Sequence, residues 1–284
     1  MAVPNSSLPR TQPLHVVYGG AHLFRPTTIL KLGDLARKAA REYDLAEALG
    51  LPSDVMAQVM TKLETEPVED FRIDFEDGFG VRPDAEEDLA AVNAAREVHN
   101  ATLPRNFGIR IKKGDRGLKT LRLFLANLER LPANFVVTLP KVTSTWEVTA
   151  LTGALREHTK IHIEIMIETP GAVFRARELV EAAKGRCVAA HLGAYDYLAS
   201  LGIAQQDLTH PACDFARSMM LASLAETGVW LADGATNLLP IPPHRGEGLT
   251  EAQKTENRAA VQAAWKLHYD NTRRALYNGF YQGW

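Results

Sequence analysis

The segment at residues 161–169 constrains the fold of this chain more than any other. Isoleucine occupies its odd positions as far as residue 167, and four other residues occupy the even positions: His162, Glu164, Met166 and Glu168. Strict alternation with a period of two predicts a β-strand, and β-branched residues suit a pleated, half-buried surface. Two carboxylates and an imidazole on one face do not suit a strand that lies over an apolar core. We therefore expect this face to line the interior of a barrel that contains a site.

A helix start follows this strand directly. Thr169 supplies a capping hydroxyl, and Pro170 stands at the first helical position, which is a common way to begin a helix. Glu168 is therefore expected at the carboxyl end of a strand that leads into a helix. In (β/α)₈ barrels the catalytic groups lie at this end of the strands.

Further segments with strand character alternate with helical patterns along the chain. They lie at residues 14–24, 70–75, 107–112, 135–139, 187–192 and 229–232. Seven strands that alternate with helices imply a parallel sheet, and we expect an α/β chain with a single (β/α)₈ TIM-barrel domain over residues 1–284. Residues 1–13 are expected to form a flexible N-terminal arm, and residues 250–284 a C-terminal helical segment. An eighth strand is not evident from the sequence.

The composition narrows the choice of partners. The formal net charge is −2, which gives no general electrostatic reason to expect nucleic acid or an anionic membrane as a partner. The two cysteines form no paired motif, as in a cytoplasmic protein without a disulfide scaffold. No apolar run approaches the ~20 residues that span a bilayer, and the N-terminal residues do not resemble a secretory signal.

Charged residues gather at the expected carboxyl ends of the strands. They are Glu76, Asp77, Arg110, Lys141, Glu168, Asp196 and Asp233. Burial of unpaired charge is very costly, so we expect the carboxylates to hold a cation and the basic residues to hold an anionic substrate. Oxygen ligands without a thiolate favour a hard metal ion, Mg²⁺ or Mn²⁺. Such an ion would act as a Lewis acid on developing enolate charge.

Five short motifs in order carry a resemblance to a known family. They are Arg-Ile-Asp-Phe-Glu-Asp at 72–77, Gly-Ile-Arg at 108–110, Leu-Pro-Lys-Val at 139–142, Met-Ile-Glu-Thr-Pro-Gly-Ala at 166–172 and His-Leu-Gly-Ala-Tyr-Asp-Tyr at 191–197. Together they resemble the citrate lyase β-subunit-like branch of the HpcH/HpaI aldolase superfamily, which is related to malate synthase. The resemblance extends from about residue 70 to residue 233.

The resemblance implies both an activity and a metal site. It implies a (β/α)₈ barrel in which Glu168 and Asp196 hold Mg²⁺ and Arg110 binds the carboxylate or oxo group of the substrate. Proteins of this family form or cleave carbon–carbon bonds next to a carbonyl, through an enolate of acetyl-CoA or pyruvate. They often assemble as homo-oligomers, either trimers or hexamers. The expected partners are therefore a small carboxylic acid, a CoA thioester and further copies of the chain.

The same match gives roles to the remaining charged residues. Glu76 and Asp77 would lie near the metal through water, and Lys141 would line the pocket. The aldolase branch carries a Glu-His pair after its second strand, with the histidine as acid/base, whereas Glu76 is here followed by Asp77. An acidic group is therefore expected to move the proton, and Glu76 and Asp77 are the candidates. Asp233, at the end of the seventh strand, is a further candidate contact to the substrate.

Alternative interpretations remain at the level of the sequence. The first function is a Mg²⁺-dependent carbon–carbon lyase, the second a pyruvate aldolase that does not use CoA, and the third a regulatory subunit that binds metal and carboxylate without turnover. Individual residues also have structural alternatives. Glu168 could be a salt-bridged carboxylate, and Asp196 a helix N-cap. Arg110 could neutralise Glu76 or Asp74 inside the barrel.

Overall fold

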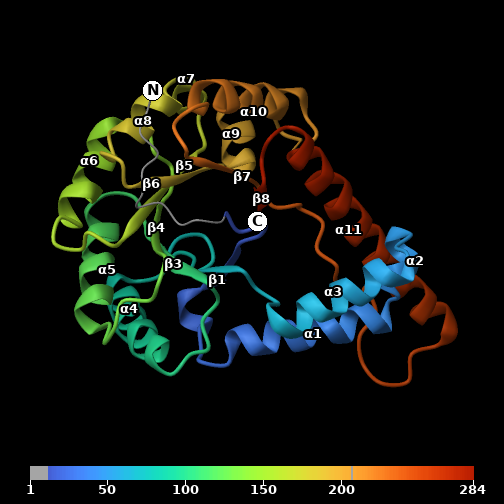
Figure 1. The fold of residues 1–284 in the computed structure, drawn as a ribbon. Helices are drawn as coiled ribbons and strands as arrows, with labels where there is room; N and C mark the ends of the chain where they lie inside the picture. The colour runs from blue at the N-terminus through green and yellow to red at the C-terminus, as the bar shows by residue number, and fades with distance from the viewer. Residues whose placement is uncertain (1–11, 206) are drawn as a thin grey trace.

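Eight parallel strands follow one another in sequence order around a barrel (Figure 1). The computed structural model describes residues 12–205 and 207–284, so the expected N-terminal arm lies almost wholly outside the described residues. The strands are β1 (Val17–Gly20), β2 (Asp70–Asp74), β3 (Asn106–Arg110), β4 (Phe135–Leu139), β5 (His162–Ile167), β6 (Cys187–Leu192), β7 (Trp230–Asp233) and β8 (Gln282–Gly283). The expectation of a (β/α)₈ barrel is confirmed.

Helices surround the strands and also extend to one side of them. The helices are η1 (Ala21–Leu23), α1 (Thr28–Glu42), α2 (Leu45–Leu49), α3 (Ser53–Thr65), α4 (Asp84–His99), α5 (Gly114–Asn127), α6 (Thr145–Ala154), α7 (Pro170–Phe174), α8 (Ala176–Glu181), α9 (Ala194–Ser200), α10 (Pro211–Leu224) and α11 (Glu251–Tyr277). In Figure 1, α4 to α10 follow the outside of the barrel, whereas α1, α2 and α3 lie together beside α11. Among the described residues, no helix combines the length and the apolar character that a membrane crossing requires.

The alternation in β5 sorts its residues between two environments. Ile163, Ile165 and Ile167 are fully buried in the apolar layer between the strands and the helices. Glu164 and Met166 have the opposite parity and face the interior of the barrel, where Glu164 bonds to residues of other strands. Thr169 begins α7 as expected, because its hydroxyl accepts a hydrogen bond from the backbone N–H of Ala172 at 3.2 Å.

The eighth strand, which the sequence did not reveal, closes the barrel. The backbone of Gly283 accepts a hydrogen bond from the N–H of Val16 at 2.9 Å and donates one to the carbonyl of Leu14 at 3.1 Å. On the other side, the N–H of Trp284 donates to the carbonyl of Asp233 at 3.2 Å. Figure 1 accordingly shows the C-terminus near the centre of the ring of strands. Helix α11 therefore occupies most of the expected helical segment, and the residues after it form a turn and β8.

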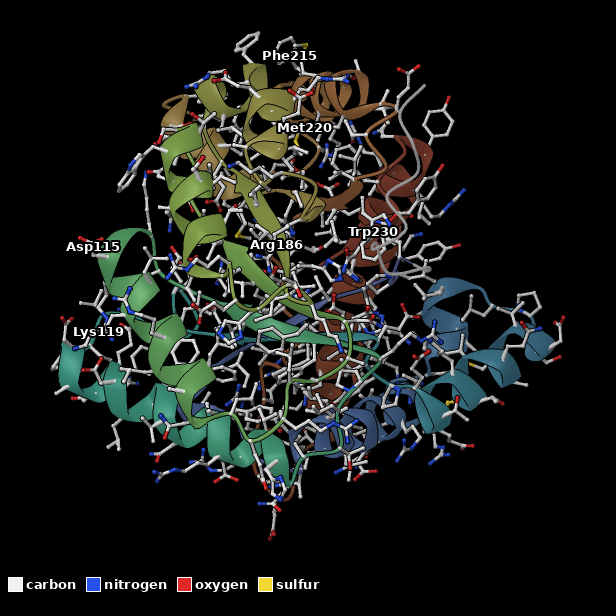
Figure 2. The ribbon with its side chains drawn as sticks, turned by 60° about the vertical axis from the view of Figure 1, so that its left-hand side comes forward. Asp115, Lys119, Arg186, Phe215, Met220 and Trp230 are labelled. Atoms are coloured by element: carbon white, nitrogen blue, oxygen red, sulfur yellow. The ribbon has the colours of Figure 1, made fainter. Side chains whose placement is uncertain are left out.

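Apolar side chains gather near the amino ends of β4, β6 and β7. Val136, Val188 and Ala189 form a small buried cluster, and the partly buried Trp230 packs against it. Arg186, labelled in Figure 2, precedes β6 and donates to the carbonyls of Leu155 and Ile161 at 2.8 and 2.7 Å. The candidate site residues lie toward the opposite end of the strands, as in other barrels of this kind, whereas the buried ion pair of Asp70 and Arg72 lies nearer the amino end of β2.

Candidate active site

Glu168 and Asp196 lie together at the carboxyl ends of β5 and β6. The Glu168 carboxylate is almost fully buried and accepts a hydrogen bond from the backbone N–H of Lys141 at 2.6 Å. Burial raises the pKa of Glu168 to about 7, and the negative charge of Asp196 adds to this shift. Asp196 lies in the first turn of α9, after Gly193. A Cβ atom at Gly193 would overlap the Glu168 side chain, so this glycine permits the close approach of the two elements.

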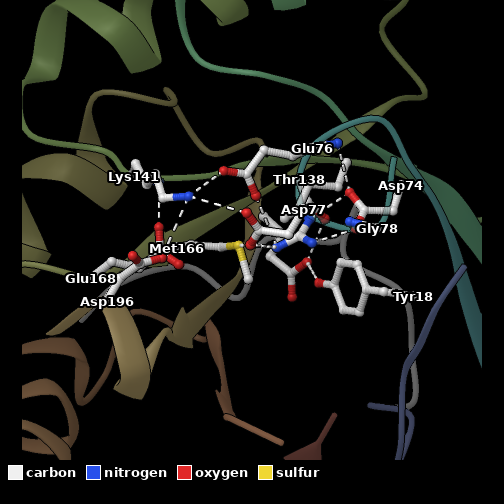
Figure 3. Close-up of polar contacts among 12 residues, drawn as sticks. Tyr18, Asp74, Glu76, Asp77, Gly78, Thr138, Lys141, Met166, Glu168 and Asp196 are labelled. Carbon is white, nitrogen blue, oxygen red and sulfur yellow. Dashed lines mark hydrogen bonds and ion pairs between the residues drawn. The ribbon is translucent and has the colours of Figure 1, made fainter. Parts of the chain in front are cut away.

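Lys141 joins the two sides of the site. Its ammonium group forms an ion pair with Glu76 and lies 3.4 Å from Asp77 and 3.5 Å from Asp196 (Figure 3). Burial alone would lower the pKa of Lys141, but these carboxylates raise it above its usual value, so the side chain stays charged. The backbone φ of Lys141 is +52°. A lysine in the left-handed region is unfavourable, and such strain often occurs at functional sites.

Arg110 is held by a carboxylate on the neighbouring strand. Its Nε donates to Asp74 at 2.7 Å, and its Nη2 pairs with the other oxygen of the same carboxylate. Asp74 in turn accepts from the backbone N–H groups of Glu76 at 2.9 Å and Gly78 at 2.7 Å. The Nη1 corner of Arg110 lies 3.2 Å from Glu76 and 3.4 Å from Asp77. Arg110 therefore does neutralise carboxylates inside the barrel, as the structural alternative expected. Its Nη1 atom still faces the rest of the site.

Glu76 and Asp77 differ in accessibility although they are adjacent in sequence. The side chain of Glu76 is 11% exposed and is occupied by Lys141 and Arg110, and burial raises its pKa. The side chain of Asp77 is 57% exposed, and its contacts to Arg110 and Lys141 are both 3.4 Å long. Asp77 is thus the carboxylate of this pair that a substrate can reach.

The structure does not bring Asp233 into this cluster. Its carboxylate accepts hydrogen bonds from Nε of Arg217 at 2.9 Å and from the N–H of Gly234 at 2.9 Å. The physical reason is strand parity: Asp233 shares a face with Leu231, which packs in the helical layer, whereas Ala232 between them faces the interior. The contact between Asp233 and the substrate stays a prediction. The hydrogen bonds of Asp233 to Arg217 and Gly234 argue against it, because they already engage both carboxylate oxygens.

Some residues that contact Arg110 were not identified from the sequence as site residues, among them Tyr18, Trp284 and Asp74. The ring centroids of Tyr18 and Trp284 lie 4.9 and 5.2 Å from the Arg110 guanidinium carbon, and both carboxylate oxygens of Asp74 bind Nε and Nη2 of Arg110. Strand alternation around Arg72 and Glu76 could have indicated Asp74, since all three share one parity. Trp284 gave no such signal because β8 has only two residues.

The charges at the site suit a divalent cation. Five carboxylates (Asp74, Glu76, Asp77, Glu168 and Asp196) surround two basic groups (Arg110 and Lys141). Within residues 12–205 and 207–284, no group of three or more His, Cys, Asp or Glu side chains is arranged to hold a metal ion. Mg²⁺ usually keeps several waters and takes one or two protein carboxylates. Glu168 and Asp196 fit that requirement.

These features define a (β/α)₈ barrel with an acidic, arginine-containing site at the carboxyl ends of its strands. The chain belongs to the family described as Domain of unknown function (DUF6986), whose family model matches residues 4–284. No curated protein matches the chain.

Solved structures share the fold at low sequence identity. A citrate lyase from Burkholderia xenovorans LB400 is 17% identical with a TM-score of 0.55, and the match covers 98% of this chain and 96% of that one. RipC from Yersinia pestis is 18% identical with a TM-score of 0.52, over 77% and 83% of the two chains. Malate synthase from Haloferax volcanii, in a pyruvate/acetyl-CoA ternary complex, is 14% identical with a TM-score of 0.51, over 92% and 69%. These structures share the (β/α)₈ fold that the resemblance of the five motifs implies.

Proposed function

We propose that this protein is a Mg²⁺-dependent carbon–carbon lyase of the citrate lyase β-like type. It would form or cleave a bond next to a carbonyl through the enolate of a small oxo or hydroxy acid, or of its CoA thioester. The observation that carries the proposal is the excess of carboxylates around Glu168, whose raised pKa reflects burial beside Asp196. The shared fold of a citrate lyase and a malate synthase supports it.

The basic residues would bind and orient the acid. Nη1 of Arg110 faces Glu76 and Asp77, and a substrate carboxylate or oxo group would take the place of one of these carboxylates. Lys141 adds a second fixed positive charge beside the same region. Fixed charges aimed at a developing negative charge are usually the largest contribution to such catalysis. Glu168 and Asp196 would hold the metal ion, which supplies Lewis-acid stabilisation of negative charge when bound.

Asp77 would move the proton. In the cleavage direction it takes the proton of the substrate hydroxyl while the carbon–carbon bond breaks, and the bonding electron pair passes to the enolate near Arg110. Asp77 then gives this proton to the enolate carbon, which yields the free acid or thioester and restores the Asp77 carboxylate. Asp77 suits this role because its carboxylate is accessible and only loosely paired, whereas Glu76 is tied to Lys141 and Arg110.

Deuterium exchange tests the enolate without knowledge of the second substrate. The protein is incubated in heavy water with pyruvate or acetyl-CoA, with and without Mg²⁺, and loss of the methyl proton signals is followed by NMR. We expect exchange that requires Mg²⁺ and is lost in Glu168→Gln. Glu178→Gln serves as the matched control, because Glu178 is an exposed carboxylate on α8 that pairs with Arg175.

The pattern of exchange distinguishes the alternatives. Exchange of the acetyl-CoA methyl would support the CoA-dependent lyase, and exchange of the pyruvate methyl alone would support an aldolase. Mg²⁺ binding that is lost in Glu168→Gln, without exchange of either methyl, would contradict the enolate chemistry and favour a regulatory subunit. Assembly as a homo-oligomer stays a prediction that sedimentation or light scattering would test.

A further inference from the structure

The guanidinium group of Arg110 contacts a carboxylate along its edge and two aromatic rings that come from other parts of the chain. Along the edge, Asp74 takes Nε and Nη2. The guanidinium carbon also lies over the rings of Tyr18 and Trp284, 4.9 and 5.2 Å from their centroids. The two rings also contact one another, with centroids 4.6 Å apart.

Each ring has its own anchor. The hydroxyl of Tyr18 donates a hydrogen bond to Glu164 at 3.0 Å, which holds the Tyr18 ring in place. Trp284 is placed by β8, which pairs with residues 14–16 just before β1 and with β7 and so closes the barrel. The imidazole of His191 contacts both rings edge-on, with centroids 6.3 Å from Tyr18 and 5.9 Å from Trp284. Its lowered pKa, caused by burial, keeps this third ring neutral.

This arrangement leaves Nη1 as the guanidinium nitrogen that Asp74 does not bind. An arginine that only formed the fork with Asp74 could tilt about the line that joins the two paired nitrogens. Ring faces beside the guanidinium oppose that tilt through the attraction between a cation and an aromatic ring. Nη1, the nitrogen that faces Glu76 and Asp77, is therefore held in a fixed direction.

We propose that Tyr18 and Trp284 are positioning residues that hold the plane of the Arg110 guanidinium, so that Nη1 is aimed at the carboxylate of a bound acid. The identity of the ligand as a small carboxylate rests on the proposed function, whereas the contact between the rings and the guanidinium does not. Trp284 makes the closing strand part of the site, since that strand brings the indole to Arg110.

The first test needs no ligand. In the NMR spectrum of the unaltered protein, ring currents from Tyr18 and Trp284 are expected to shift the Nε–H proton of Arg110 away from the values of the exposed arginines. Trp284→Phe should keep part of the shift, and Trp284→Met, which retains bulk without a ring, should remove most of it. Trp146→Phe is the control, because Trp146 is 68% exposed on α6. An unshifted Arg110 resonance in the unaltered protein would overturn the proposal even if a variant did not fold.

The second test measures the consequence for binding. Oxalate, a planar dicarboxylate that resembles the enolate of pyruvate, is titrated into each Mg²⁺-loaded protein by calorimetry. A cation–aromatic contact of ~1.4 kcal/mol corresponds to about a tenfold change in affinity. We expect Trp284→Met to bind oxalate about tenfold more weakly and Trp284→Phe to stay near the unaltered value. Equal affinity in folded Trp284→Met would overturn the proposal.

The two tests separate this proposal from the proposed function. If the unaltered protein shows the shifted Arg110 resonance but binds no oxalate, the aromatic support is established and the small-acid function is contradicted. If oxalate binds and Glu168→Gln abolishes that binding while the Arg110 resonance is unshifted, the function is supported and the aromatic support is wrong.

Discussion

Two buried arginines in this barrel each pair with an aspartate at a strand end, yet their surroundings differ. Arg217 on α10 donates to Asp233, to Asp214 at 3.0 Å and to the carbonyl of Leu208 at 2.9 Å. These partners all lie around Arg217 on the side of β7 that faces the helices. Arg110 also binds both oxygens of an aspartate, but its Nη1 lies near two further carboxylates, Glu76 and Asp77, beyond the carboxyl end of β2.

The difference separates a structural ion pair from a site. A buried arginine with matched partners adds no charge that a ligand could use, and removal of either partner mainly affects stability. The group around Arg110 carries more carboxylates than its basic residues can balance. Such an imbalance is costly unless a cation or a reaction makes use of it. The predictions below test this contrast, from the largest expected effect to the smallest.

Replacement of each arginine by methionine gives the sharpest comparison. Arg110→Met and Arg217→Met should each lower the free energy of unfolding by roughly 3–5 kcal/mol, because each leaves a buried aspartate unpaired. Only Arg110→Met should also lose Mg²⁺–oxalate binding. Urea unfolding and calorimetry measure the two effects. Equal loss of oxalate affinity in folded Arg217→Met would remove the distinction between the two pairs.

Asp77→Asn should separate proton transfer from stability. We expect the rate of methyl-proton exchange to fall about 10²- to 10⁴-fold, the range for loss of a general acid or base. Because the side chain is 57% exposed, the free energy of unfolding should change by no more than about 0.5 kcal/mol. Asp88→Asn is the control, since Asp88 pairs with Arg116 and Lys119 away from the barrel interior. An unchanged exchange rate in Asp77→Asn would assign the proton to another group.

The raised pKa of Glu168 makes stability depend on pH in the metal-free protein. Its folded-state value of about 7 lies above the ordinary value of 4.5, so the folded state binds the proton more tightly than the unfolded chain. The resulting stability is fully present below pH 4.5 and is lost as the pH rises through 7. The size is on the order of 3 kcal/mol. The difference between the unfolding profiles of the unaltered protein and Glu168→Gln should show this loss, and Mg²⁺ should reduce it; a pH-independent difference would contradict the shift.

Gly193→Ala should have the smallest effect. The added Cβ would overlap the Glu168 side chain, so we expect overpacking to cost about 1–3 kcal/mol and Mg²⁺ affinity to fall. Gly153→Ala, inside α6 with no atom within 4 Å of its Cβ, should instead stabilise the protein by up to about 1 kcal/mol. Similar Mg²⁺ affinity in both variants would show that the approach of Gly193 to Glu168 is not needed for the metal.

Much of the fold could be predicted from the sequence, because a buried parallel strand with one polar face leaves a clear period-two pattern. The isoleucines of β5 and the charged residues around Arg72 and Arg110 show it directly. β8 could not be predicted in this way. A strand of two residues, Gln282 and Gly283, is too short to show alternation, and one of its two pairing partners lies at the other end of the chain.

The clustering of the candidate site followed from strand ends, whereas its internal pairing did not. Residues at the carboxyl ends of successive strands must lie near one another, so Glu76, Arg110 and Glu168 could be expected together. Only the structure shows which face of β7 carries Asp233, and that Arg217, distant in sequence, binds its carboxylate. The left-handed backbone of Lys141 was likewise not predictable, because no local sequence rule requires a lysine there.

The short strand that closes the barrel also has a consequence for the folding reaction. Its hydrogen bonds join Leu14 and Val16 to Gly283, so they require contact between residues separated by almost the whole described chain. Loop-closure entropy makes such a contact expensive early in folding, and a high proportion of distant contacts slows folding. We expect the earlier βα units to assemble first and the last strand to enter late. The indole of Trp284 would then report on that final step, since it reaches Arg110 only when the barrel closes.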